Sequence, residues 1–174
     1  MNITKLLFLS IISFFILSTY SCQKKNRMAN HEIINSIDDY TGWVMNKDII
    51  VKGEANSGTK YVSLGEKSAY GPRYKIHADE LLSLRKVNVE FSVRTYEENT
   101  KALYVFQILR GDSNICWKSY DIRAKKIQPN EWTQVEKIFD FSKFKLEPND
   151  LISIYPWSPD NIKVDFDDIK IEFK

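Results

Sequence analysis

The sequence KVNVEFSVRTY, at residues 86–96, alternates apolar and polar side chains along its whole length. The apolar positions are Val87, Val89, Phe91 and Val93. Arg94 lies among the polar positions that separate them. Successive side chains of a β-strand point to opposite faces of a sheet, so this alternation predicts a strand with one face in a core and the other in water.

The segments that flank this stretch extend the same pattern. Residues 102–110 (ALYVFQILR) are apolar on both faces, which favours a place in the middle of a sheet. The turn sequence GDSN follows at residues 111–114, and residues 115–123 read as the returning strand of a hairpin. Alternation and β-branched residues predict further strands at residues 48–52, 60–64, 132–141, 151–155 and 162–173. Residues 77–84 fit either a short helix or a loop.

About eight regularly spaced strands with almost no helix predict an all-β fold. The expected architecture is a two-sheet antiparallel β-sandwich of jelly-roll type, with an immunoglobulin-like sandwich as the alternative. In the last strand, Val164 and Phe166 share one parity and Ile169 takes the other. A change of parity within a strand is typical of a β-bulge, which we expect at Asp167 and Asp168.

The first 21 residues read as an export signal rather than as part of the fold. Lys5 precedes an apolar run at residues 6–17, which is shorter than the roughly 20 residues that a membrane-spanning helix needs. The small residue Ser21 before Cys22 resembles the lipobox of bacterial lipoproteins. The resemblance implies that Cys22 carries a diacylglycerol and anchors the chain to a membrane, whereas the alternative is ordinary cleavage near Ser21.

A lipid at Cys22 implies an exported protein of the cell envelope, anchored in the outer membrane and facing either the periplasm or the exterior. Residues 22–30 then form a polar tether, and residues 31–174 form one domain. The chain has 25 Lys and Arg residues against 23 Asp and Glu residues, a balance of +2 that gives no electrostatic basis for nucleic-acid binding. With Cys22 acylated, Cys116 is the remaining cysteine and is predicted to be an unpaired core residue.

Four short motifs resemble those of carbohydrate-binding-module jelly rolls, which belong to the galactose-binding-like superfamily. They are NSIDDYTGW at residues 35–43, ANSGTKYVSL at residues 55–64, EWTQV at residues 131–135 and VDFDDIKI at residues 164–171. Their order and spacing cover nearly the whole mature chain. The resemblance implies the same fold, but the superfamily includes many members that bind no sugar, so it does not settle the function.

Many members of that group hold a structural calcium between the first and last strands. Carried over by position, the resemblance implies Asp38 and Asp167 as ligands, helped by backbone carbonyls near Ser57 and Gly58. The opening motif departs from the pattern, because Asp38 stands in place of the usual Glu and Ile37 in place of the aromatic residue.

Sugar binding needs exposed aromatic faces for the rings and polar side chains for the hydroxyls. Strand parity places Arg94 and Trp117 outward, and Gln107 on a neighbouring strand joins them, so we expect these three to share one sheet face. Trp157 is expected on a loop at the sandwich edge, which is the other common binding position. Trp132 is expected in the core.

The sequence gives little support to catalysis. His31 and His77 are its two histidines, and the alternating Asp165 and Asp167 lack the accompanying glutamate of retaining jelly-roll glucanases. The leading hypothesis is therefore a non-enzymatic, lipid-anchored envelope protein whose module binds a glycan. A protein-interaction sandwich of an envelope complex is the alternative, and a small glycan-active enzyme is the third.

Overall fold

The structure is a computed structural model that describes residues 31–81 and 85–174. The predicted signal segment at residues 1–21, the predicted lipidation site Cys22 and the predicted tether at residues 22–30 lie outside the described residues. Within the described residues, no helix has both the length and the apolar character required to cross a membrane.

The described chain contains ten strands. They are β1 (His31–Asn35), β2 (Ile50–Lys52), β3 (Lys60–Leu64), β4 (Tyr74–His77), β5 (Lys86–Thr95), β6 (Leu103–Arg110), β7 (Ser113–Asp121), β8 (Thr133–Asp140), β9 (Leu151–Trp157) and β10 (Val164–Phe173). Three single-turn 3-10 helices accompany them, namely η1 (Lys47–Ile49), η2 (Ala78–Glu80) and η3 (Ile122–Ala124).

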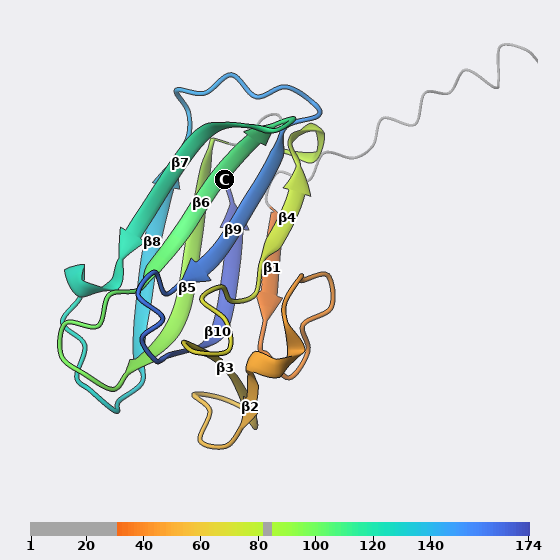
Figure 1. Cartoon of the computed structure of the whole chain (residues 1–174). Helices are drawn as coiled ribbons and strands as arrows, with labels where there is room; N and C mark the ends of the chain where they lie inside the picture. The colour runs from red at the N-terminus through yellow and green to blue at the C-terminus, as the bar shows by residue number, and fades with distance from the viewer. Residues whose placement is uncertain (1–30, 82–84) are drawn as a thin grey trace, which may run out of the picture.

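These strands form two antiparallel sheets. A six-stranded sheet has the order β2-β3-β10-β5-β8, with β1 also paired to β10, and a four-stranded sheet has the order β4-β9-β6-β7. Figure 1 shows the four-stranded sheet in front, with the six-stranded sheet behind it. The predicted two-sheet jelly-roll sandwich is confirmed, and β6 lies between two partner strands as its apolar faces predicted.

Stacked aromatic rings join the two sheets through the core. Phe91 of β5 stacks on Tyr104 of β6 at 4.5 Å between ring centroids, and Phe106 stacks on both Phe139 and Phe141. Such pairs add about 0.5–1.5 kcal/mol each beyond the area they bury. Cys116 is buried on the inner face of β7, which confirms its predicted place in the core.

The β-bulge in the last strand is confirmed. The register of β10 against β5 shifts between Asp167 and Lys170, and Asp168 has a φ of 48°. Because of this shift, Phe166 and Ile171 both point inward although their parities differ. The bulge also divides one edge of β10, since β3 pairs before it and β1 pairs after it.

The structure corrects three sequence expectations. Strands β1 and β4 were not expected, because HEIIN does not alternate apolar and polar side chains and YKIH has only four residues. The sequence at residues 77–84 allowed a short helix or a loop, and its described part contains the single turn η2. Trp132 is half-buried on the outer face of the six-stranded sheet rather than in the core, because its ring packs against Arg94.

Candidate functional site

A straight row of four side chains crosses the outer face of the four-stranded sheet. Gln107 of β6 is the register partner of Trp117 on β7 and of Ser153 on β9, and Ser153 is the partner of Lys75 on β4. Register partners point to the same face, and neighbouring strands lie about 4.8 Å apart, so the row spans roughly 14 Å. The predicted sharing of one face by Gln107 and Trp117 is confirmed.

The next row toward the lower end of the sheet contains Tyr155 of β9, paired with Val105 of β6. The Arg73 guanidinium carbon lies 4.2 Å from the centroid of the Tyr155 ring. The Trp117 indole lies close enough to the Tyr155 hydroxyl to lower the pKa of that hydroxyl slightly, so the two rows are neighbours on this face. Burial raises the pKa of Tyr155, against a smaller lowering by Arg73, so the hydroxyl stays protonated at neutral pH.

A stacked ring pair completes this face. Tyr70, from the loop between β3 and β4, bridges to Trp157 at the end of β9, and their rings stack at 5.9 Å with an interplanar angle of 8°. Gly71 lets the loop lie this close, because a Cβ there would overlap the Pro156 ring. Trp157 is the last residue of β9 and has the same parity as Ser153, so it points to the same face as Trp117. This corrects its expected place on an edge loop.

We call Tyr70, Trp117, Tyr155 and Trp157 the aromatic platform. Trp117 is 45% exposed and Tyr70 is 48% exposed, although most large apolar side chains of the described chain are buried. Tyr155 itself is buried, and with Leu103 and Val105 it forms a small apolar cluster that is separate from the main core and against which Trp157 packs. This cluster supports the partly exposed rings of Trp117, Tyr70 and Trp157 on the sheet face, where they can stack on a flat ligand.

Polar groups lie within the same surface. Gln107 offers an amide beside Trp117, and Lys75 offers an exposed ammonium at the β4 edge. The buried Ser153 Oγ between them has no hydrogen-bond partner among the described residues. Exposed rings flanked by amide, hydroxyl and cationic groups have the composition of a site for a polyhydroxylated ligand.

Arg94 lies on the other sheet, so the prediction that it shares a face with Gln107 and Trp117 is wrong. Alternation in β5 correctly placed Arg94 outward, but the chain crosses between the sheets after β5. Asp165 Oδ2 accepts hydrogen bonds from Arg94 Nε at 3.1 Å and from Nη2 at 2.8 Å. The rings of Trp132 and Tyr61 flank the guanidinium at 4.6 and 4.9 Å.

One oxygen of the Asp165 carboxyl, Oδ2, accepts the hydrogen bonds of this network. Tyr96 also donates to Asp165 Oδ2 at 2.5 Å, and burial together with this carboxylate raises the pKa of Tyr96. Arg94 Nη1 and the Trp132 indole both donate to the Glu54 carbonyl. The cluster ties β5 and β10 to the loop before β3.

Asp38 and Asp167 both bind the loop of residues 56–59. Asp167 Oδ2 accepts from the backbone N–H groups of Asn56 and Ser57, and Asp38 accepts from the N–H and hydroxyl of Thr59. Burial, with the nearby Asp168 charge, raises the pKa of Asp167 to about 6, whereas the bonds from Thr59 lower the pKa of Asp38.

These contacts do not fit a calcium site. Calcium needs six to eight oxygen ligands, but the carboxylate oxygens here face N–H and O–H donors, and the Lys60 ammonium lies 3.7 Å from Asp38 Oδ1. Within the described residues, no group of three or more His, Cys, Asp or Glu side chains is placed to hold a metal ion.

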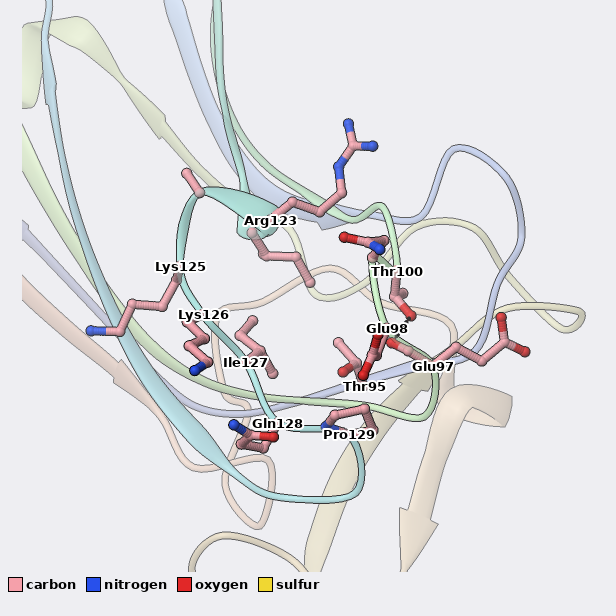
Figure 2. Close-up of a pocket in the computed structure, with 13 residues that line it drawn as sticks. Thr95, Glu97, Glu98, Thr100, Arg123, Lys125, Lys126, Ile127, Gln128 and Pro129 are labelled. Atoms are coloured by element: carbon pink, nitrogen blue, oxygen red, sulfur yellow. Dashed lines mark hydrogen bonds between the residues drawn. The ribbon is translucent and has the colours of Figure 1, made fainter.

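A hollow of about 540 Å³ lies between the two loops that cross from one sheet to the other, after β5 and after η3. Figure 2 shows that its side chains come from both loops, with Glu97 and Lys125 extending to opposite sides. The residues lining it, all in the described part of the chain, include charges of both signs but no aromatic ring. It offers no stacking surface comparable to the platform.

Solved structures similar to this chain include several carbohydrate-binding modules. The CBM22-2 xylan-binding domain of Paenibacillus barcinonensis Xyn10C has a TM-score of 0.55 at 11% identity, over 83% of this chain and 99% of that one. Its CBM22-1 domain has a TM-score of 0.52 at 15% identity, over 81% and 92%. A family 22 module of Clostridium thermocellum Xyn10B has a TM-score of 0.50 at 12% identity, over 77% and 86%.

The sequence matches no protein-family model and no curated protein sequence. At these low identities the structural likeness concerns the fold. The chain folds as a jelly-roll β-sandwich of the kind seen in carbohydrate-binding modules.

Proposed function

We propose that this chain is a non-catalytic glycan-binding module, exported and held at the cell envelope by a lipid on Cys22. The observation that carries the proposal is the row Trp117–Gln107–Ser153–Lys75, which places an exposed indole, an amide, a hydroxyl and an ammonium in line across one sheet face. Such a row suits an extended sugar chain, whose rings stack on the indole while its hydroxyls meet the polar groups.

The structural neighbours support a polysaccharide ligand, since two of them are described as xylan-binding domains. The platform is open along the sheet, which suits a chain longer than a single sugar. The acids that would have to act in catalysis are held in other contacts, with Asp165 bonded to Arg94 and Asp167 bonded to the loop of residues 56–59. We therefore infer capture of a glycan rather than its cleavage.

A protein-docking role receives less support from the exposed apolar residues. Ile34 on β1 and Ile138 on β8 are 62% and 53% exposed on the outer face of the six-stranded sheet. Strands β10 and β5 lie between them and present charged side chains, among them Lys170 and Glu90. The two isoleucines therefore do not form one continuous apolar patch.

A polysaccharide-binding measurement tests the proposed function. The mature chain without the cysteine proposed to carry the lipid, residues 23–174, would be titrated with xylan, mixed-linkage glucan and a glycan array, beside Trp117→Ala. Loss of the indole face should weaken binding by about fivefold to about a hundredfold, since stacking contributes roughly 1–3 kcal/mol per ring. Ile138→Ala removes an exposed apolar side chain on the other sheet and serves as the matched control. Absence of binding by a folded chain across the whole panel would reject the proposal.

The anchor is tested separately. Cells that express the full chain would be labelled with radioactive palmitate and fractionated, beside a Cys22→Ala variant. We expect label in the protein and recovery in the membrane fraction for the unchanged chain, with both lost on substitution. Unlabelled protein released in soluble form from unchanged cells would show ordinary cleavage near Ser21 instead.

A further inference from the structure

We propose that the ligand of the aromatic platform is an acidic polysaccharide whose carboxylate groups bind at the β4 edge of the platform, on Arg73 and Lys75. This inference rests on the proposed function, because it names the class of glycan that the same face selects.

The charges around the platform are unevenly distributed. Arg73 and Lys75 stand two residues apart on one face of the chain that enters β4, so their Cα atoms lie about 7 Å apart. Within the described residues neither forms an ion pair, whereas Arg94, Arg110 and Arg123 are each paired to a carboxylate. The β4 edge of the described chain therefore presents two cations that are not held in an ion pair with a carboxylate.

The opposite edge of the platform carries an acid, but its charge is already balanced. Asp121 at the end of β7 accepts hydrogen bonds from Arg123 Nε and Nη2, at 3.0 and 2.6 Å, and this contact lowers the pKa of Asp121. The rows of the platform defined above contain no other carboxylate. An anionic chain lying along the row from Trp117 to Lys75 thus meets a net positive surface.

Arg73 is also held in a suitable orientation. Its guanidinium packs over the Tyr155 ring at 4.2 Å and lies 5.8 Å from the centroid of Tyr70. Packing against a ring leaves the N–H groups at the edge of the guanidinium free for a carboxylate, which such a planar fork binds with two parallel hydrogen bonds. A sugar that stacks on Tyr70 or Trp157 can place a carboxylate on its ring next to this fork.

Lys75 supplies a second contact of a different kind. Its ammonium is an exposed, mobile point charge at the end of the row that begins at Trp117. With Arg73 about 7 Å away on the same face, two carboxylates on successive or alternate sugars of one chain can be bound together. Neutral xylan would lack both contacts and keep the stacking and the hydroxyl contacts.

The test compares each acidic polymer with its own carboxyl-reduced form, in which the uronic acid becomes a neutral sugar and the backbone is unchanged. Glucuronoxylan and polygalacturonate would be titrated calorimetrically into the mature chain in both forms. We expect the acidic form of at least one polymer to bind about tenfold more tightly than its reduced form at low salt, and this preference to shrink in 0.5 M NaCl.

Substitutions test which side chains cause the preference for the acidic form. Arg73→Gln and Lys75→Gln should remove most of the preference for the acidic form, with about tenfold and about threefold losses respectively, while the weaker binding of the reduced form remains. Lys52→Gln, on β2 in the other sheet, makes the same change in net charge away from the platform and should leave the preference intact. Trp117→Ala should weaken binding of both forms.

The outcomes separate this inference from the proposed function. Equal affinity for the acidic and reduced forms, with both lost in Trp117→Ala, would overturn selection by charge and leave the glycan-binding role standing. An equal loss in Lys52→Gln and Lys75→Gln would also overturn it, because net charge rather than the β4 edge would then be responsible. No binding of any polymer by the folded chain would overturn both.

Discussion

Arg94 and Asp165 are register partners on neighbouring strands, and their side chains form a 2.8 Å ion pair on the outer face of the six-stranded sheet. Asp165 is fully buried and Arg94 is nearly so. Removing the cation would leave the carboxylate buried without its partner, so we expect Arg94→Gln to lower the free energy of unfolding by about 3 kcal/mol. Urea denaturation of the mature chain measures this loss.

Arg123→Gln is the matched control for that substitution. Arg123 forms the same type of pair with Asp121, but both side chains are substantially exposed, so its loss should destabilise the chain clearly less than the loss of Arg94. Similar losses for the two variants would show that the Arg94 pair contributes no more than a surface contact.

Gly58 and Gly111 provide a second comparison. Both have positive φ, at 62° and 55°, so alanine at either position adopts a strained backbone at a cost of about 1–2 kcal/mol. At Gly58 the new Cβ would also overlap Asp38 Oδ2, whereas nothing lies within 4 Å at Gly111. We expect Gly58→Ala to lower the melting temperature clearly more than Gly111→Ala. Equal shifts would contradict close packing of Asp38 on this loop.

Asp167 should make the stability depend on pH. Its pKa is raised from 3.8 to about 6 in the folded state, so between these values the folded chain binds more protons than the unfolded chain. Stability from this group is therefore complete below about pH 4 and is lost as the pH rises through 6. Relative to Asp167→Asn, the wild type should lose up to about 3 kcal/mol over this range.

Denaturant titrations at several pH values would measure the difference between the two chains. The comparison with Asp167→Asn is needed because other acids, among them Asp38 and Asp150, have lowered pKa values and act in the opposite direction. A difference between wild type and variant that stays constant from pH 4 to 6.5 would contradict the raised pKa.

Calcium is expected to have no effect on folding of the described domain. The two acids implied by the family resemblance, Asp38 and Asp167, already bind the N–H groups of residues 56–59. The melting temperature should therefore be the same in 2 mM calcium and in excess chelator. A rise of several degrees with calcium, absent in Asp167→Asn, would reveal a ligand set that the present contacts do not form.

Local sequence patterns predicted much of this fold. The alternation in β5, the two apolar faces of β6 and the parity change at Asp167 each report on neighbours along one strand, and all three predictions are confirmed. Strand β4 was missed because its sequence, YKIH, has four residues and follows Pro72. It is recognised as a strand by its pairing with β9, which its own sequence does not report.

The candidate site was harder to predict, because it depends on which sheet each strand joins. Gln107 and Trp117 belong to one hairpin, so their shared face followed from local parity. Arg94 has the same outward parity but lies across the sandwich, which no local pattern reports. Tyr70 and Arg73 were missed because isolated bridges in the segment before β4, rather than a strand with its own pattern, place them on the platform. The GPR sequence at residues 71–73 was the available signal of a turn.

One edge of β10 pairs with β3 before the bulge and with β1 after it, and this arrangement has a mechanical consequence. Within its sheet β1 pairs with β10 alone, through five register partners that begin at His31 and Phe173. A pulling force applied at residue 30 would open these pairs one after another, because the chain enters at the free end of the strand. Peeling would halt at Asn35 and Ile37, which are fully buried next to the bulge.

Under such a load β1 yields first, while β3 and β5 keep their places on β10 and the four-stranded sheet keeps the aromatic platform. If the chain is tethered to a membrane at one end and to a polymer at the other, this order of opening would lengthen the link by several residues before the bound surface is disturbed.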